Sequence, residues 1–410
     1  MRPFAFLHAA DIHLDSGFAG LALADPALAE ALAQGTRRAF VNLVDAALAE
    51  PVDFVVLAGD LYDGRWRDVR TALFARQQFR RLAEAGIAVV AVKGNHDAES
   101  EVADAAPPPD NVHVFPSRAP GTHRIESLRV AIHGQSFARR HIPEDLSRGY
   151  PAPLPGWFNV AVLHTSADGR AGHAVYAPCD VAALRASGHD YWALGHVHAR
   201  EALSEDPPIW YPGCLQGRHV GETGPKGALR VRVRDGRAEV AFLPLDVARW
   251  SAPVVALDGI DSEAARRRAV AAALREALDA AEGRVALVRL RLLGATPLDA
   301  GLRRRGRAAL REEAATLAAD LSDLLAVERV EIATSPPRAA DPVLLAPFAP
   351  ALAEAAADPA LHAALRAEIA ELDRLPAEAR PASPDPAELI AEARRLLLAR
   401  ADDAGGESAP

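Results

Sequence analysis

Along the first 245 residues, short apolar runs are separated by amphipathic or polar stretches, a pattern typical of strands followed by helices. Six short apolar runs predict strands that are buried on both faces, at 4–10, 53–59, 87–93, 129–134, 159–164 and 191–196, and three later runs predict further strands. Amphipathic stretches at about 36–50 and 68–85 lie between the first three runs and predict helices. The predicted strands are FAFLHAA (4–10), DFVVLAG (53–59), IAVVAVK (87–93), RVAIHG (129–134), NVAVLH (159–164), YWALGH (191–196), IWYPG (209–213), ALRVRVR (228–234) and AEVAFLPL (238–245).

A second pattern covers residues 249–335, where three apolar runs alternate with two amphipathic stretches. The runs PVVALDG, RVALVRLRLL and ERVEIAT predict strands, and residues 262–281 and 297–325 predict helices. We therefore predict a layered α/β (α+β) protein with a domain at 1–245 and a small α/β domain at 249–335.

The segment 342–410 follows a proline-marked linker and predicts helices. Its last helix is expected to begin with Asp385 as the N-cap and Pro386 at the first helical position. This helix carries an apolar stripe that either packs on the core of the protein or docks onto a partner, and DDAGGESAP after it predicts disorder. The stripe consists of Leu389, Ile390, Ala393, Leu396 and Leu397.

The formal net charge of −9 argues against a strongly basic, freestanding nucleic-acid binder. Residues 340–410 hold 13 acidic and six basic side chains, however, so the remaining residues carry a net charge of only −2. The two cysteines, Cys179 and Cys214, exclude a disulfide framework and favour a reduced, cytoplasmic protein. No signal peptide or membrane-spanning stretch is expected.

Five polar segments each follow a predicted strand. Because residues just beyond the carboxyl ends of strands in an α/β sheet converge on one crevice, we expect these segments to meet. Their Asp, Asn and His side chains offer oxygen and nitrogen ligands, which favour manganese, iron or zinc. A carboxylate such as that of Asp60 could bridge two cations that clamp a phosphate. The segments are Asp11-x-His13, Gly59-Asp60-x-x-Asp63, Gly94-Asn95-His96-Asp97, His164 and Gly195-His196-x-His198.

The ordered set D-x-H, G-D-x-x-D, G-N-H-D, H and G-H-x-H resembles the signature of the calcineurin-like metallophosphoesterases. FLHAADIHLDSGF, DYWALGHVH and YPGCLQGRHVGETGPKG are also similar to DNA repair nucleases of the SbcD/YhaO type. The resemblance implies a β-sandwich flanked by helices. The 249–335 region is similar to the family's capping domain in size and position, whereas the C-terminal helical segment 342–410 matches nothing specific in the family.

The resemblance also implies a role for each site residue. One metal would be held by Asp11, His13, Asp60 and His198, and the other by Asp60, Asn95, His164 and His196. His96 would be the catalytic histidine outside the metal shell, oriented by Asp63. Asn95 would also bind the substrate. Apart from the resemblance, Arg218 and His219 of the QGRH segment could contact substrate phosphate, because Arg offers a bidentate fork, although an ordinary surface loop is almost as well supported. The other histidines (His8, His133, His141, His173 and His189) are predicted to be structural or exposed.

The predicted function is that of a DNA exonuclease or endonuclease with two divalent metal ions, manganese being favoured. The resemblance implies a homodimer that acts in DNA repair with an SbcC-like coiled-coil ATPase. This chain contains no G-x-x-x-x-G-K-[ST] phosphate loop, so any ATP hydrolysis must come from a partner. Two alternatives stay open. One is a phosphodiesterase or phosphatase for small nucleotides or phosphoproteins, and the other is a DNA-binding subunit that keeps the fold without turnover.

Overall fold

The computed structural model describes most of the chain and divides it into two compact units. We call residues 1–251 and 278–287 the N-terminal unit, and residues 252–277 and 288–410 the C-terminal unit. His173, Leu396, Leu397 and the tail 402–410, for which predictions were made, lie outside the described residues. The described residues are 2–18, 32–64, 68–100, 106–168, 176–337, 349–372, 385–391 and 393.

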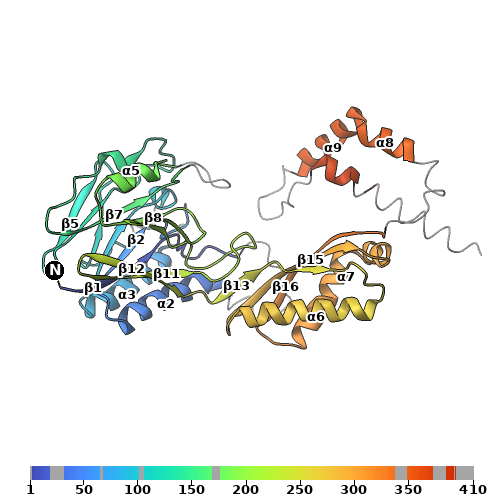
Figure 1. Ribbon diagram of the computed structural model, residues 1–410, viewed down its shortest axis with the longest axis horizontal. Helices are drawn as coiled ribbons and strands as arrows, with labels where there is room; N and C mark the ends of the chain where they lie inside the picture. The colour runs from blue at the N-terminus through green and yellow to red at the C-terminus, as the bar shows by residue number, and fades with distance from the viewer. Residues whose placement is uncertain are drawn as a thin grey trace, which may run out of the picture. The chain divides into compact units, whose positions relative to one another are not determined.

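The N-terminal unit contains two six-stranded sheets (Figure 1). The first has the order β12-β11-β1-β2-β3-β4, and the second has the order β5-β6-β7-β8-β10-β9. The strands of the first sheet are β1 (Phe4–Ala9), β2 (Phe54–Ala58), β3 (Ala88–Val92), β4 (Val112–Val114), β11 (Gly227–Arg234) and β12 (Arg237–Pro244). Those of the second are β5 (Gly121–Ile125), β6 (Val130–Gly134), β7 (Phe158–His164), β8 (Tyr191–Gly195), β9 (Glu201–Glu205) and β10 (Pro208–Tyr211).

The central strands of both sheets run parallel, so their carboxyl ends lie at one edge. In the first sheet β1, β2, β3 and β4 pair in parallel, with Phe6 opposite Phe54. In the second sheet β6, β7 and β8 pair in parallel, with His164 opposite Gly195. The strands β1, β2, β7 and β8 are buried along their whole length, as expected for parallel strands with both faces covered.

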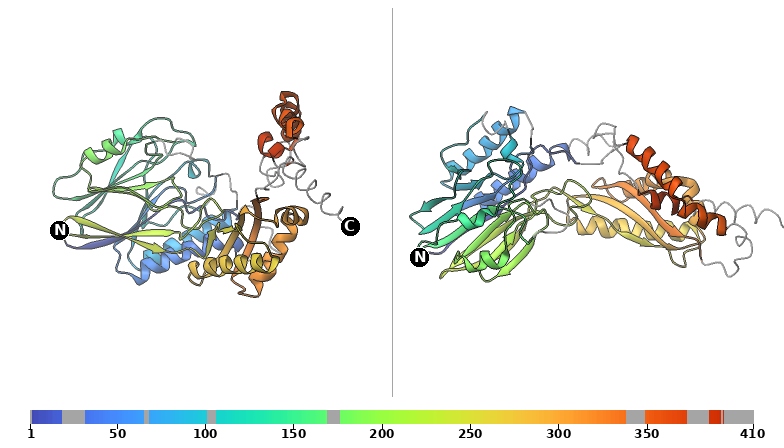
Figure 2. Two further views of the ribbon diagram at one scale, coloured as in Figure 1. Left: turned by 45° about the vertical axis from the view of Figure 1, so that its right-hand side comes forward. Right: turned by 90° about the horizontal axis from the view of Figure 1, so that it is seen from above.

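Apolar side chains fill three layers of the N-terminal unit. Phe6, Phe54 and Tyr191 lie in the core between the two sheets. Helices α2 (Gly35–Ala49) and α3 (Val69–Glu84) cover the outer face of the first sheet, and α5 (Val181–Ala186) packs against the second. The views in Figures 1 and 2 show these helices on opposite sides of the two sheets. The predicted class, a β-sandwich flanked by helices, is confirmed.

The region from β13 onward contains a four-stranded sheet with the order β13-β15-β14, in which β16 pairs with β15. Its strands are β13 (Ala248–Ser251), β14 (Val254–Ala256), β15 (Val285–Ala295) and β16 (Leu325–Ser335). Helices α6 (Glu263–Ala280) and α7 (Asp299–Ala319) supply the crossovers and pack together on one face of β15 and β16. Helix α7 contains a break at Gly306, whose φ of 78° is readily adopted by glycine.

Most elements agree with the sequence pattern, and the differences have local causes. The predicted helix 297–325 ends at Ala319, because DLSDL (320–324) contains the Asp and Ser residues that favour turns. The sequence reading missed β4, β5, β9 and α5, which are three to six residues long and partly exposed. Further along the chain, α8 (Ala349–Ala357) and α9 (Pro359–Leu372) are present.

The predicted start of the last helix is also confirmed. Residues 386–391 are helical, and the Ala387 N–H donates to Asp385 Oδ1 at 3.0 Å, which is an N-cap. Among the described residues, none of the helices combines the length and hydropathy that a membrane crossing needs.

Candidate metal centre

Seven predicted metal ligands gather at the carboxyl ends of five strands in the N-terminal unit. Asp11 and His13 follow β1, Asp60 follows β2, and Asn95 follows β3. His164 is the last residue of β7, while His196 and His198 follow β8. The parallel pairing of these strands thus brings together residues that are up to 187 positions apart in the sequence.

The backbone of this cluster adopts conformations that residues other than glycine seldom take. The φ angles of Asp11, His13, Asp60 and His196 are 51°, 47°, 55° and 102°. Hydrogen bonds hold these turns: the His13 N–H donates to Asp60 O at 3.0 Å, and the His196 N–H donates to Asp11 Oδ2 at 2.9 Å. Such strain concentrates at functional sites, where surrounding structure stabilises it.

Two glycines allow the strands to bring these side chains close together. A Cβ atom on Gly59 would lie 2.4 Å from His164 Nδ1, and one on Gly94 would lie 2.2 Å from Asp60 Oδ1. Both distances are far below van der Waals contact. The glycines of the G-D-x-x-D and G-N-H-D motifs are therefore required by packing.

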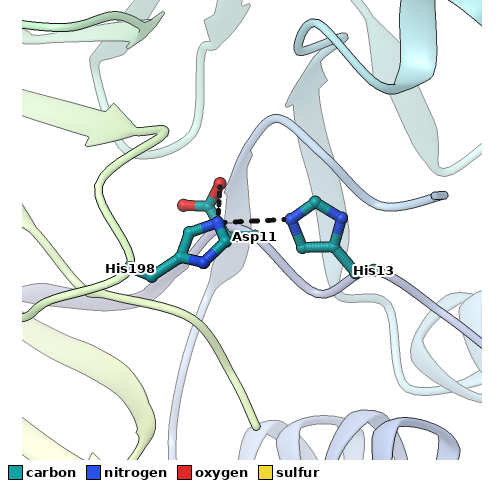
Figure 3. A group of neighbouring side chains, drawn as sticks. All are labelled: Asp11, His13 and His198. Carbon is teal, nitrogen blue, oxygen red and sulfur yellow. Dashed lines mark hydrogen bonds and ion pairs between the residues drawn. The ribbon is translucent and has the colours of Figure 1, made fainter. Parts of the chain in front are cut away.

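Asp11, His13 and His198 form the first group of potential ligands (Figure 3). His198 Nε2 lies 3.4 Å from His13 Nε2 and 3.7 Å from Asp11 Oδ1. His13 Nε2 is in turn 3.8 Å from Asp60 Oδ2. His198 Nδ1 lies 2.5 Å from Glu222 Oε1. Since an ionised carboxylate only accepts hydrogen bonds, Nδ1 carries the proton and Nε2 presents a lone pair to His13 and Asp11.

The second group surrounds His164. Its Nδ1 atom lies 2.9 Å from the carbonyl oxygen of Ala58, which can only accept, so Nδ1 carries the proton here too. The unprotonated Nε2 atom therefore faces two further acceptors, Asn95 Oδ1 at 2.9 Å and Asp60 Oδ2 at 3.5 Å. The ring of His196 lies beside that of His164, with 5.3 Å between centroids. Asp60 is thus adjacent to both groups.

The acceptor atoms in each group fit divalent cations. In the second group the lone pair of His164 Nε2 faces Asn95 Oδ1 at 2.9 Å, an arrangement that is unfavourable unless a cation lies between the two atoms. Buried carboxylate, amide and imidazole groups at these positions form an oxygen and nitrogen donor set suited to such ions. The structure thus brings together all seven predicted ligands, Asp11, His13, Asp60, Asn95, His164, His196 and His198.

Burial determines the charge states of these groups when they are metal-free. It raises the pKa of Asp11 well above its usual range and, with smaller opposing effects from His96, raises that of Asp60 to about 6. Burial also lowers the pKa of His13 well below 6.5 and that of His164 to about 3. Neutral imidazoles are the form that binds metal, whereas two adjacent carboxylates resist ionisation until a cation compensates them.

His96 and Asp63 lie beside the first group and contact each other. His96 Nδ1 is 2.9 Å from Asp63 Oδ1, and this hydrogen bond raises the pKa of His96. The contact with His13 Nδ1, at 3.5 Å, and the hydrogen bond from His96 lower the pKa of Asp63. The His96 and His13 rings are 4.8 Å apart. His96 is also close enough to His13 and Asp60 to join them around a cation, so geometry alone permits either a ligand or a non-ligand role.

Two of the predicted substrate residues, Arg218 and His219, lie on the loop after β10. Arg218 Nη1 donates to Ser16 Oγ at 3.0 Å, and Arg218 Nη2 lies 3.6 Å from Glu222 Oε1. The half-exposed His219 has Nε2 at 3.4 Å from the same Glu222 oxygen. The structure therefore places both residues next to His198 through Glu222.

Asp97 and Glu222 were not assigned roles from the sequence. Asp97 is buried and accepts hydrogen bonds from the N–H groups of Leu61, Tyr62 and Gly94 at 3.2, 2.8 and 3.0 Å. It thus ties the loop of Asp60 to the loop of Asn95. Its position in the G-N-H-D motif was a signal for it. Glu222 lies in the segment YPGCLQGRHVGETGPKG, whose resemblance to the nucleases assigned it no role.

The structural role predicted for two other histidines is confirmed. His8 lies in β1, with Nδ1 3.0 Å from the Tyr191 hydroxyl and Nε2 3.1 Å from Leu194 O. His133 contacts Thr122 and Asn159 through its ring nitrogens, at 3.0 and 3.2 Å.

Two family models match this chain. Residues 4–200 match the calcineurin-like phosphoesterase family. Residues 250–335 match the model described as metallophosphoesterase YhaO, middle domain.

Similar curated proteins come from bacteria and archaea. The metallophosphoesterase YhaO of Bacillus subtilis is 38% identical over 260 residues, which cover 62% of this chain and 64% of that protein. The DNA double-strand break repair protein Mre11 of Methanopyrus kandleri is 28% identical, covering 50% of this chain and 47% of that protein. The protein of the same name from Aeropyrum pernix is 30% identical, covering 54% and 56%. The chain thus spans about half to two thirds of the length of these relatives.

Proposed function

Because the chain carries a calcineurin-like phosphoesterase domain, a domain of metal-dependent hydrolases, we propose that it hydrolyses phosphodiester bonds in DNA. The observation that carries the proposal is the cluster of nitrogen and oxygen ligand atoms around Asp60. His164 Nε2 faces Asn95 Oδ1 at 2.9 Å, and His13 Nε2 faces His198 Nε2 at 3.4 Å. Two cations, one in each group, would satisfy these atoms.

Each ligand group would bind one cation. When bound, two divalent cations, proposed to be manganese, would neutralise the phosphate charge and lower the pKa of a water nucleophile. Asp11, His13, Asp60 and His198 would hold one cation. Asp60, Asn95, His164 and His196 would hold the other. Asn95, with its amide group, would also help to orient the phosphate.

His96 would supply the proton for the leaving oxygen. Its Nδ1 atom is engaged by Asp63 at 2.9 Å, so Nε2 is the atom that can donate to substrate. The contact with Asp63 raises the pKa of His96, which keeps a larger fraction of the imidazole protonated near neutral pH. A positioned acid of this kind contributes roughly 100- to 10,000-fold to a rate.

DNA is proposed as the substrate on the strength of the relatives, two of which are named for DNA double-strand break repair. Arg218 and His219, which reach the cluster through Glu222, are proposed to contact phosphates. Because each neutralised phosphate releases counterions, binding to DNA should weaken steeply as salt increases.

A direct test compares substrates in manganese. Labelled single- and double-stranded DNA, a chromogenic phosphodiester and a mononucleotide are incubated with the full chain over a salt series. We expect DNA cleavage that decreases with salt and disappears in EDTA. Efficient turnover of the small esters without DNA cleavage at any salt would instead establish a small-molecule phosphodiesterase or phosphatase. DNA binding without any turnover would indicate a binding subunit.

An SbcC-like ATPase, a homodimeric state and a cytoplasmic location are part of the same proposal. The apolar residues Leu389 and Ile390 of the capped last helix lie on a segment outside the metal cluster, and an amphipathic helix of this kind can dock into a groove of a partner. Truncation at about residue 340, or Asp at Leu389 and Leu396, should abolish pull-down of the ATPase while DNA cleavage persists. A truncated chain that is active and still binds the ATPase would place the docking surface elsewhere.

A further inference from the structure

Glu222 is a buried carboxylate that lies next to the metal cluster. It is 4% exposed and follows β10 in the loop that also holds Arg218 and His219. Burying a carboxylate is costly unless charged or hydrogen-bonding partners compensate it. The groups that contact Glu222 therefore indicate its role.

The partners surround both carboxylate oxygens. Oε1 lies 2.5 Å from His198 Nδ1, 3.4 Å from His219 Nε2 and 3.6 Å from Arg218 Nη2. Oε2 accepts a hydrogen bond from the Arg218 N–H at 2.6 Å. The shortest side-chain contact of Glu222 is thus the one with a proposed metal ligand.

This contact fixes the tautomer of His198. With the proton on Nδ1, the lone pair of Nε2 faces Asp11 and His13. The carbonyl oxygen of Ala58 fixes His164 in the same way. Both histidines therefore have an acceptor behind the ring, but only the acceptor behind His198 is a side chain and can be substituted.

Glu222 also connects His198 to the segment that carries His13. Arg218, which it contacts, donates to Ser16 at 3.0 Å, three residues beyond His13. His13 and His198 belong to the same ligand group, so Glu222 and Arg218 link the two segments that carry these histidines. A buried acceptor that orients a ligand typically changes metal affinity by about 10- to 100-fold.

We propose that Glu222 is a positioning residue that holds His198 in the tautomer and orientation needed to bind the cation shared with Asp11 and His13. This inference rests on the proposed function, because it requires a cation at that group. It differs from the proposed function in assigning control of one of two cation sites to a residue that touches neither substrate nor metal.

The test is a calorimetric titration of the metal-free full chain with manganese chloride, alongside melting temperatures in EDTA. Glu222→Ala should weaken one of two manganese sites by about 10- to 100-fold and leave the other unchanged. Glu222→Gln should have a smaller effect, because its amide oxygen can still accept from Nδ1. The conservative variant also keeps the test decisive if Glu222→Ala fails to fold.

Glu50→Gln is the matched control. It removes a carboxylate that forms a 2.6 Å ion pair with Arg230 in the same unit, but contacts none of the proposed ligands. It should bind two manganese ions like the wild type, whatever its melting temperature. A merely structural role for Glu222 would lower the melting temperature in EDTA without changing the affinity of the folded protein.

Two outcomes would overturn the inference, and they are distinguishable. If both Glu222 variants bind two manganese ions with wild-type affinity, Glu222 does not position His198 and the proposed function is unaffected. If the wild type binds no manganese, magnesium, iron or zinc, the proposed function fails and the role of Glu222 fails with it.

Discussion

Both units bury carboxylates, but those of the metal cluster are compensated differently from those of the C-terminal unit. In the C-terminal unit Asp299 receives two hydrogen bonds of 3.0 Å from Arg303 Nε, and Glu328 receives bonds of 2.7 and 2.9 Å from Arg289. In the N-terminal unit the carboxylates of Asp11 and Asp60 face imidazoles at 3.5 to 3.8 Å. A guanidinium compensates a carboxylate permanently, whereas a neutral imidazole does not.

The pKa directions follow this difference. Burial alone would raise the pKa of Glu313 in the C-terminal unit, but hydrogen bonds from Arg267 and Arg266 lower it. Burial raises the pKa of Asp60 to about 6, and no comparable cation offsets it. The buried ion pairs of the C-terminal unit thus need no further cation. The carboxylates and imidazoles of the metal cluster, in contrast, leave a charge that a bound metal ion would compensate.

The largest expected effect is that of Asp60→Ala. This change removes the carboxylate adjacent to both ligand groups, so metal content and nuclease activity should be lost together. Elemental analysis and a DNA cleavage assay in manganese measure the two. Glu328→Gln, which breaks a buried ion pair of the C-terminal unit, is the control and should retain both ions. Full manganese occupancy in Asp60→Ala would show that Asp60 does not bridge the site.

The second prediction concerns the C-terminal unit. Asp299→Ala leaves the buried guanidinium of Arg303 without its carboxylate and removes the acceptor of the Thr334 hydroxyl. Breaking a buried pair in this way costs about 3–5 kcal/mol. Denaturant unfolding in EDTA should show this loss, while manganese binding by the folded chain remains. The exposed Asp261→Ala should change stability little, and a comparable loss there would undermine the assignment.

The sequence predicted where the buried strands end and which motif residues follow them, but it did not predict the short strands or the contacts that hold the motif residues in place. Buried parallel strands such as β1 and β7 leave continuous apolar runs, and motif residues follow them directly. The short strands β4, β5 and β9 were missed because their residues are partly exposed and alternate weakly. The position of β4 depends on its pairing with β3, as between Val89 and Val112.

The same limit applies to the candidate site. The ligand types and their order were visible because each lies beside a strand and belongs to a motif. The contact between Glu222 and His198 joins residues 24 positions apart in loops whose paths are set by tertiary packing. Periodicity carries no information about such a contact. The ion pairs of the C-terminal unit, such as Arg289 with Glu328, were invisible for the same reason.

The third prediction separates chemistry from metal binding within the cluster. His96→Asn should lower turnover by about 100-fold or more, the usual scale of general acid catalysis, while manganese content remains near wild type. His123→Asn, on the partly exposed strand β5, is the control and should have wild-type turnover. An empty site in His96→Asn would make His96 a ligand, which its proximity to His13 and Asp60 also permits.

The last prediction uses pH to compare the two units. Burial lowers the pKa of His8 in the N-terminal unit to about 3. As the pH falls below about 6.5, His8 becomes protonated in the unfolded chain but stays neutral in the folded chain. The contribution of His8 to the free energy of unfolding is therefore fully present above pH 6.5 and is lost as the pH falls toward 3. At pH 5 the loss is about 2 kcal/mol. The stabilisation from Glu313 in the C-terminal unit, whose pKa is lowered, is instead retained until the pH falls below about 4.5.

Asp60 and Asp97 have the opposite effect on stability. Their pKa is raised to about 6, so below that pH the folded chain binds protons that stabilise it relative to the unfolded chain. The informative quantity is therefore the difference between the wild type and His8→Gln, measured by denaturant unfolding in EDTA at pH 7 and pH 5. His8→Gln loses contacts with Tyr191 and Leu194 and should be less stable at pH 7. Its deficit should shrink by about 2 kcal/mol at pH 5, since the variant no longer has this titrating group. The exposed His141→Gln should show no such change. A deficit for His8→Gln that stays constant between the two pH values would show that buried His8 does not account for acid sensitivity of the N-terminal unit.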